Sequence, residues 1–224
     1  KGVYDSLKKI IPAVNASMSL SDGYIKSSEF PLPLEDMRFN ATVQNTSGKM
    51  AETFIAVKNF GMLLDGEKVT ADLLLQNLDD YTWDLKANGS LDLEKITKIF
   101  PVEGMTLAGK VKADIQTKGK YSDVEAGKYD RLPTSGTASL TGLKYASSDL
   151  PYSVTVSTAE AAFDPKKIDV KNTKGTIGKS DFAVSGSINN YMGYLFSPNE
   201  TIKGTMNFNS TLLDLNEFMT ETEE

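Results

Sequence analysis

A phrase of twelve residues occurs twice in the chain and decides the fold. Residues 20–31 read Leu-Ser-Asp-Gly-Tyr-Ile-Lys-Ser-Ser-Glu-Phe-Pro, and residues 140–151 read Leu-Thr-Gly-Leu-Lys-Tyr-Ala-Ser-Ser-Asp-Leu-Pro. Each copy has a leucine, a Gly-containing turn, a Ser-Ser-acid triplet, and an apolar residue before proline. The repetition predicts a duplicated β unit, in which the two phrases mark where the sheet turns.

Three further phrases recur in the same order. Ile-Ala-Val-Lys-Asn at 55–59 returns as Ile-Asp-Val-Lys-Asn at 168–172, Gly-Ser-Leu at 89–91 as Gly-Ser-Ile at 186–188, and Leu-Ala-Gly at 107–109 as Ile-Lys-Gly at 202–204. The spacing between the copies falls from 120 residues for the first phrase to 113, 97 and 95 residues for the others. The conserved order predicts a tandem duplication, and the falling spacing predicts a missing hairpin in the second unit.

Between these phrases, apolar and polar residues alternate, for example over residues 14–21, 37–44 and 69–76. Such alternation is typical of strands with one buried face. Roughly a dozen strands joined by short polar turns predict an all-β protein with two or three short helices. We expect an antiparallel meander of tandem duplicated β units, curled into an elongated trough, an open barrel or a sandwich.

The chain divides into four predicted segments. Residues 1–11 are compatible with an amphipathic helix that ends at Pro12, and residues 220–224 form a disordered acidic tail. Residues 12–127 form the first β unit, with a helix over residues 91–100. Residues 128–219 form the second unit, in a sheet continuous with the first, after a polar loop at 118–133.

Composition excludes several classes of function. The chain has no histidine and no cysteine, which removes the commonest general base, the commonest transition-metal ligand and every thiol nucleophile. Its net charge of -6 argues against nucleic-acid binding. No apolar run approaches the roughly 20 residues of a membrane span. Because the chain begins at Lys1, we interpret it as a segment of a longer protein. We expect no catalytic residue, metal or cofactor.

Two motifs resemble known sites but lack their partners. Ser-Leu-Lys-Lys at 6–9 matches the Ser-x-x-Lys of β-lactamase-like hydrolases without their other two motifs. Gly-Met-Thr-Leu-Ala-Gly-Lys at 104–110 resembles a phosphate-binding loop, but Val111 replaces the magnesium-binding hydroxyl and a strand follows. We interpret the first as surface residues and the second as a turn. A hydrolase on carboxylates would need two acids about 5–9.5 Å apart, and nothing in the sequence brings such a pair together.

The apolar sides of the strands form either a dry core between two walls or a groove open to an apolar ligand. The sequence alone leaves both open. The candidate groove residues are apolar side chains expected to point inward from several strands: Leu73, Leu75, Trp83, Leu85, Leu107, Val111, Val154, Val156, Met206 and Phe208.

Five stretches, some of which overlap the repeated phrases, resemble the AsmA-like family of bacterial envelope proteins, in the large versions of Bacteroidetes-type bacteria. They are Ser-Leu-Asp-Leu at 90–93, the helix that ends at Pro101, Leu-x-Gly at 107–109, Gly-Lys-Tyr-Asp-Arg-Leu-Pro-Thr-Ser-Gly at 127–136, and Gly-Ser-Ile-Asn-Asn-Tyr at 186–191. The resemblance covers about residues 12–219. Its motifs are turns and strand starts, so it identifies no site.

The resemblance implies a non-enzymatic periplasmic segment, anchored to the inner membrane by a segment not present here. AsmA-like proteins are related to TamB and to bridge-like lipid-transfer proteins, and are associated with outer-membrane biogenesis and lipid transport. It therefore implies an apolar inner β face that contacts phospholipid acyl chains. The alternative is a structural or protein-binding β scaffold at the cell envelope, with a dense core and an exposed edge strand.

Overall fold

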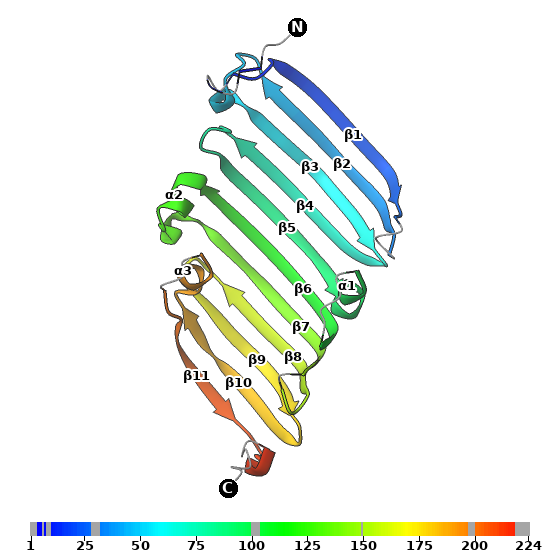
Figure 1. Cartoon of the computed structure of the whole chain (residues 1–224), viewed down its shortest axis with the longest axis vertical. Helices are drawn as coiled ribbons and strands as arrows, with labels where there is room; N and C mark the ends of the chain where they lie inside the picture. The colour runs from blue at the N-terminus through cyan, green and yellow to red at the C-terminus, as the bar shows by residue number, and fades with distance from the viewer. Residues whose placement is uncertain are drawn as a thin grey trace.

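The computed structural model describes residues 4, 5, 7, 10–27, 32–99, 104–148, 150–196 and 200–217. The described residues form one sheet of 11 strands, each antiparallel to its neighbours in the sequence (Figure 1). The predicted antiparallel meander is therefore confirmed. The strands are β1 (Val14–Ile25), β2 (Leu34–Asn45), β3 (Phe54–Leu64), β4 (Glu67–Gln76), β5 (Thr82–Asp92), β6 (Met105–Lys120), β7 (Thr134–Ser147), β8 (Val154–Phe163), β9 (Lys167–Ile177), β10 (Ser180–Asn189) and β11 (Lys203–Asn209).

Short helices lie at the ends of the strands. In the described part of the chain these are α1 (Leu93–Ile99), α2 (Tyr121–Glu125) and α3 (Tyr191–Phe196), with 3-10 turns η1 (Met50–Glu52), η2 (Tyr129–Arg131) and η3 (Leu215–Glu217). The helix α1 confirms the one predicted over residues 91–100. Figure 1 shows α1 at one end of the strands, and α2 and α3 at the opposite end. Helices of five to seven residues are too small to cover a face of this sheet.

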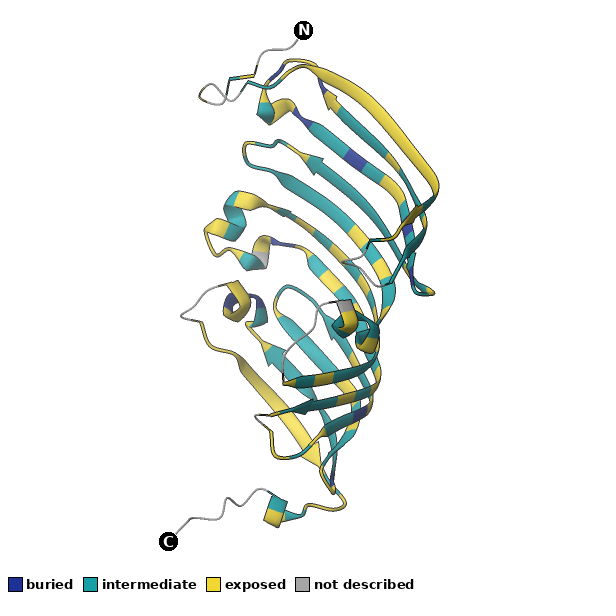
Figure 2. Ribbon diagram, turned by 45° about the vertical axis from the view of Figure 1, so that its right-hand side comes forward, coloured by how far each residue is buried: buried dark blue, intermediate teal, exposed yellow. Residues whose placement is uncertain are grey.

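The sheet forms a single curved layer (Figure 2). The chain exposes 14699 Å² of surface, whereas a compact monomer of this mass exposes roughly 10,000 Å². Among the described residues, the buried apolar side chains are only Ala56, Leu64, Leu132, Val156 and Met192. A second layer that would bury one face is therefore not supplied by the described residues.

The sheet is open at both sides. Its outermost strands, β1 and β11, each pair with one neighbour and have no second partner strand among the described residues. Closure into a barrel requires the first and last strands to pair. Because β1 and β11 do not pair, the described chain forms an open sheet, in agreement with the predicted trough.

Turns of the expected type connect the strands. Asp65 and Gly66 join β3 to β4 with φ values of 49° and 83°, and two central residues with positive φ make the hairpin turn whose twist matches the strands. Between β2 and β3, the Asn45 side chain holds the turn. Its Nδ2 donates to the Lys49 carbonyl and to Thr53 Oγ1, both at 2.7 Å, and its Oδ1 accepts from the Gly48 N–H.

The two copies of the opening phrase form β-bulges, not turns, which corrects the sequence interpretation. Their third residues, Asp22 and Gly142, have φ values of 55° and 63°. Both lie inside strands, β1 and β7, which continue beyond them. A left-handed residue inside a strand adds one residue against the partner strand and bends the chain locally. The phrase therefore encodes a bend within a strand.

A second matched pair of phrases also encodes bulges. Asn59 in β3 and Asn172 in β9 end their five-residue phrases, with φ values of 54° and 49°. Across the β3 bulge, Val57 pairs with Leu73 and Phe60 with Ala71, so three residues on β3 span two on β4. Val57 and Phe60 therefore lie on the same face despite their odd spacing. The bulges keep apolar side chains on one face when the alternation in the sequence changes phase.

Among the described residues, the two predicted units differ by one strand, and not by the expected hairpin. Six strands, β1 to β6, precede the α2 region, and five, β7 to β11, follow it. In a meander, the loss of one strand reverses every later strand. The matched helices α1 and α3 consequently lie at opposite ends of the strands (Figure 1).

Two boundary predictions also change. The described residues of 1–11 contain no helix; instead, Asp5 and Ile10 form an isolated β-bridge, and Ile10 bridges to Lys49. The predicted loop at 118–133 is partly regular, because β6 extends to Lys120 and α2 follows directly. Residues 28–31, 100–101 and 220–224, as well as Ser6 and Lys9, lie outside the described residues.

Candidate functional site

One side of the sheet is apolar from β3 to β11. Residues directly opposite each other on neighbouring strands share a face, so the register defines rows across the sheet. The Met62 row consists of Met62, Val69, Gly89, Ala113, Ala138, Ala161, Val170, Gly186 and Met206. The Phe60 row consists of Phe60, Ala71, Ala87, Ile115, Gly136, Phe163, Ile168, Ile188 and Gly204. Neither row contains a polar side chain. We call the side that carries both rows the apolar face.

The opposite side of the sheet, which we call the polar face, carries mainly polar side chains. Its Thr70 row lies between the two apolar rows along the strands and consists of Thr70, Asn88, Asp114, Thr137, Ala162, Asp169, Ser187 and Thr205. Along β6, apolar-face residues are half-buried and polar-face residues are exposed, in strict alternation from Val111 to Lys120. The predicted segregation of apolar and polar side chains is thus present in the structure.

A shallow channel follows the middle of the apolar face. Four successive strands, β5 to β8, contribute Gly89, Ala113, Ala138 and Ala161 to the Met62 row. We call these four residues the small-residue channel. Two hollows lie along it, of about 150 Å³ around Gly89 and Ala113 and of about 250 Å³ around Ala138 and Ala161. Val111 lines both hollows. The channel therefore crosses four strands, with a separate hollow toward each of its two ends.

Elsewhere on the apolar face, aromatic rings lie over glycines of the neighbouring strand. The directly opposed pairs are Trp83 with Gly119, Phe163 with Gly136, and Phe182 with Gly175. At each glycine, an added Cβ would overlap the ring. The aromatic side chain covers the gap that glycine leaves, which is a recognised way to stabilise glycine in strands. Trp83 Nε1 donates to Thr117 Oγ1 at 3.2 Å, so its polar atom is satisfied.

The ten candidate groove residues all lie on the apolar face. Leu73 opposes Leu85, and Leu75 opposes Trp83, toward one end of the strands. Near the other end, Leu107 and Val154 both oppose Tyr145. The remaining four are Val111, Val156, Met206 and Phe208. Only Val111 lines the two hollows of the small-residue channel. The structure therefore places the candidates on one surface without gathering them into one pocket.

Sequence reasoning missed the small-residue channel because a single glycine or alanine in a strand indicates no site. Gly89, Ala113, Ala138 and Ala161 become a channel only through the register, which puts them directly opposite one another. The available signal was a small residue at the middle inward position of four successive strands.

The larger hollow of the sheet is on the polar face. It measures about 650 Å³, and its lining includes Lys68, Lys112 and Lys171 beside Asp114 and Glu160. The four residues of the small-residue channel also line it, because the sheet is one layer thick, but its charged side chains make it less suited to an apolar ligand than the hollows on the apolar face. Although this hollow is larger than the two on the apolar face, we do not assign acyl chains to it, because the two apolar rows lie on the opposite face.

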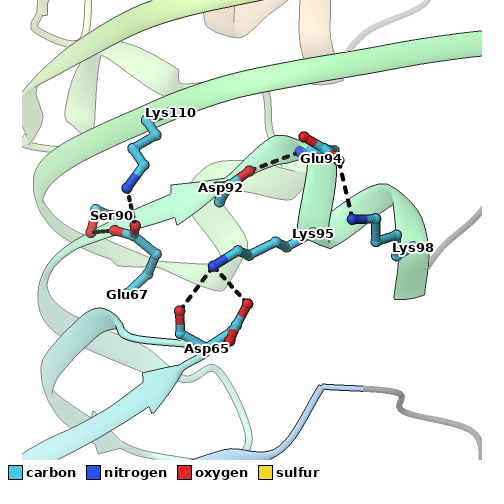
Figure 3. A network of polar contacts seen from close by, with 8 residues as sticks. All are labelled: Asp65, Glu67, Ser90, Asp92, Glu94, Lys95, Lys98 and Lys110. Carbon is cyan, nitrogen blue, oxygen red and sulfur yellow. Dashed lines mark hydrogen bonds and ion pairs between the residues drawn. The ribbon is translucent and has the colours of Figure 1, made fainter.

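A network of polar contacts fixes α1 to the sheet (Figure 3). Lys95 forms an ion pair with Asp65 at 2.6 Å, which joins α1 to the β3–β4 turn. Glu67, at the start of β4, accepts hydrogen bonds from Ser90 and from Lys110. The hydrogen bond from Lys110, and then that from Ser90, lowers the pKa of Glu67. The bond to Asp65 raises the pKa of Lys95. These shifts accompany structural ion pairs at a strand end.

Other polar groups at the strand ends also have structural partners. Asp80 lies in the β4–β5 turn and pairs with Lys120 at 2.7 Å, and the hydrogen bond from Lys120 lowers the pKa of Asp80. Of the 104–110 stretch, Gly104 alone is in a turn and the rest begins β6, so the interpretation as one turn was wrong. Among the described residues, no three acidic side chains gather as a metal site would require.

Comparison with protein-family models, with curated proteins and with solved structures gives no match for this chain. The resemblance to AsmA-like proteins therefore stays a prediction from the sequence. None of the helices in the described part of the chain combines the length and the apolar character needed to cross a bilayer.

Proposed function

We propose that this chain is a non-enzymatic periplasmic segment of an AsmA-like envelope protein, involved in outer-membrane biogenesis or lipid transport, whose apolar face contacts phospholipid acyl chains. In this proposal, a segment outside the present chain anchors the protein to the inner membrane. The observation that carries it is a single-layer sheet with two rows from β3 to β11 that contain no polar side chain. The localisation and the family rest on the sequence resemblance alone.

The free energy of hydration supports an apolar ligand on this face. Each square ångström of apolar surface removed from water contributes about 25 cal/mol. The chain exposes 14699 Å² in total, about 4,700 Å² more than a compact monomer of its mass, because a sheet of one layer exposes its apolar face as well as its polar face. Large exposed apolar patches mark binding surfaces in soluble proteins. An acyl chain would cover such a patch without requiring hydrogen bonds, and the apolar rows offer none.

In this proposal, the acyl chain lies in the small-residue channel. Gly89, Ala113, Ala138 and Ala161 leave room above the backbone, and Leu91, Val111 and Leu140 stand beside them in the next row. A chain of methylene groups laid there would cross the strands, and each group buried contributes about 0.8 kcal/mol.

The scaffold alternative retains one supporting observation. It predicted a dense core and an exposed edge strand. The described residues have the exposed edge, at β1, but bury only five apolar side chains. An open apolar face favours lipid contact over a purely structural role.

The test is the lipid content of the purified chain. Protein expressed in bacteria would be analysed by native mass spectrometry, and its organic extract would be analysed for phospholipid. We expect bound phospholipid in the parent chain. Ala138→Lys, which places a charge in the small-residue channel, should remove most of it because a charged group is costly to bury beside acyl chains.

The matched control is Thr137→Lys. Thr137 directly precedes Ala138 in β7, and its side chain lies on the polar face. We expect this variant to keep the lipid, and thermal unfolding would show that both variants fold. Absence of phospholipid from the parent chain, or equal lipid content in the two variants, would contradict the proposal.

A further inference from the structure

The outer edge of β1 differs from the edge strands of most monomeric proteins. Native edge strands are protected by charged residues, by proline, by bulges or by short length. In contrast, residues 14–21 of β1 are Val-Asn-Ala-Ser-Met-Ser-Leu-Ser, eight residues with no charge and no proline. All eight are exposed, and the first irregularity is the bulge at Asp22.

The surroundings of this edge are uncharged as well. The partners of residues 14–20 on β2 are residues 39–45, Phe-Asn-Ala-Thr-Val-Gln-Asn, again without a charge. Among the described residues, the outward N–H and C=O groups of this stretch have no partner strand, and neither β1 nor β2 places a charged side chain beside them.

The opposite edge is better protected. Strand β11 has seven residues against the twelve of β1, and it begins with Lys203. The chain after it folds back on the sheet, where Asp181 accepts hydrogen bonds from the Thr211 and Leu212 N–H groups at 2.8 and 2.6 Å. The two edges thus differ in the features that prevent strand addition.

We propose that β1 pairs antiparallel with β1 of a second copy of this chain, with Ser17 opposite Ser17 on the two-fold axis. In this register Val14 opposes Leu20, Ala16 opposes Met18, and Asn15 opposes Ser19. Apolar residues then meet apolar residues, polar meet polar, and no charges face each other. A two-fold contact of one patch with itself is the commonest form of homodimer.

In this register, the apolar face of one copy also continues into the apolar face of the other, and the polar face into the polar face. Directly opposed residues of an antiparallel pair lie on the same face, so Val14, Ala16, Met18 and Leu20 of both copies continue the apolar face. The two sheets of 11 strands join into one. With strands about 4.8 Å apart, the joined sheet extends over about 100 Å. This proposal does not depend on lipid binding.

The first test is a disulfide bond at the two-fold axis. The chain has no cysteine, so Ser17→Cys introduces a single thiol. Opposed residues of an antiparallel pair have Cα atoms about 4.5–5.5 Å apart, within the range that a disulfide spans. Mild oxidation should convert most of this variant into a covalent dimer. Ser21→Cys, on the same strand but far from the axis, and Asn207→Cys, on β11, should stay monomeric under the same oxidation.

The second test is the mass of the reduced protein in solution. Sedimentation velocity should give about twice the monomer mass of 24.4 kDa at high concentration. Ser17→Lys places two like charges opposite each other and should raise the dissociation constant about fivefold. Asn207→Lys, the same change on the polar face of β11, should leave the constant unchanged. Thermal unfolding would show that both fold.

Three results would overturn the proposal. A monomer at all concentrations would show that the β1 edge does not pair with itself. A dimer without a disulfide in Ser17→Cys would place the contact elsewhere, for example between two stacked apolar faces. A disulfide in Asn207→Cys but not in Ser17→Cys would assign the contact to β11.

Discussion

On the apolar face, the Met62 row crosses the sheet from β3 to β11 without a charged side chain, whereas the Thr70 row on the polar face carries Asp114 and Asp169. The polar face also holds ion pairs across neighbouring strands, such as Lys118 with Asp84 at 2.9 Å. Polar-face side chains such as Asp114 and Thr137 are exposed to water. The apolar face offers water no hydrogen bonds, and the described residues supply no layer to cover it. The comparison shows that the described residues leave the apolar face of this fold uncovered, whereas the polar face needs no cover.

The largest effect on stability is expected where a glycine lies under an aromatic ring on the apolar face. An added Cβ at Gly136 would overlap the Asp114 carbonyl oxygen and approach Phe163 Cζ to 2.6 Å. Gly136→Ala should therefore lower the free energy of unfolding by about 1–3 kcal/mol. Urea unfolding followed by circular dichroism would measure it.

The matched control for Gly136→Ala is Ser135→Ala, the preceding residue, which is exposed on the polar face. An exposed substitution of this kind stays within about 0.5 kcal/mol. Equal losses in the two variants would show that the faces do not differ in packing.

The next effect concerns the bulges that hold each face in register. Asn59 and Asn172 have positive φ, a conformation that costs most residues about 1–2 kcal/mol. Asn59→Val and Asn172→Val should each destabilise the fold by that amount, because a branched side chain tolerates positive φ least. Asn59→Gly and Asn172→Gly should be close to neutral. Chemical unfolding of the four variants would show whether the two copies behave alike; a neutral valine at either site would contradict the assigned bulge.

The smallest effect is expected at the polar strand end near α1. Lys110 and Ser90 lower the pKa of Glu67 in the folded chain. A carboxyl group with a lowered folded pKa stabilises the fold above its unfolded pKa, which is 4.5, and this stabilisation is lost as the pH falls through the folded pKa. The effect is small because ion pairs open to water contribute little.

Unfolding by urea between pH 7 and pH 3 would measure the contribution of Glu67. The parent chain should lose more stability below pH 4.5 than Glu67→Gln, which cannot titrate. Parallel pH profiles for the two proteins would show that the contacts of Glu67 do not stabilise the fold.

Much of the fold could be read from local sequence. Alternation along residues 69–76 predicts a strand, and Asp65-Gly66 predicts its hairpin turn, because both signals involve residues close in the chain. The bulges could not be read in the same way. Asp22-Gly23 resembles a turn in sequence, and only its pairing with β2 shows that the strand continues.

The candidate site was accessible from sequence only in part. The inward direction of Trp83 or Met206 follows from alternation within one strand. The small-residue channel depends on which residues of β5 to β8 oppose one another, and register between strands is set by bulges and turn lengths together. The sequence also could not show that the described residues supply no second layer, because alternation indicates only that one face of a strand is apolar.

The order of the strands has a consequence for how such a chain changes during evolution. Every strand pairs only with its sequence neighbours, so insertion of one hairpin would lengthen the sheet by about 9.5 Å without replacing more than one existing pair. Insertion of a single strand would instead send every later loop to the other end of the sheet. The opposite positions of α1 and α3 are the arrangement that such an odd step would produce (Figure 1). Where the loops must stay at the same end of the sheet, strands can therefore be inserted or lost only in pairs. Where the position of the loops is not constrained, strands can be inserted or lost singly.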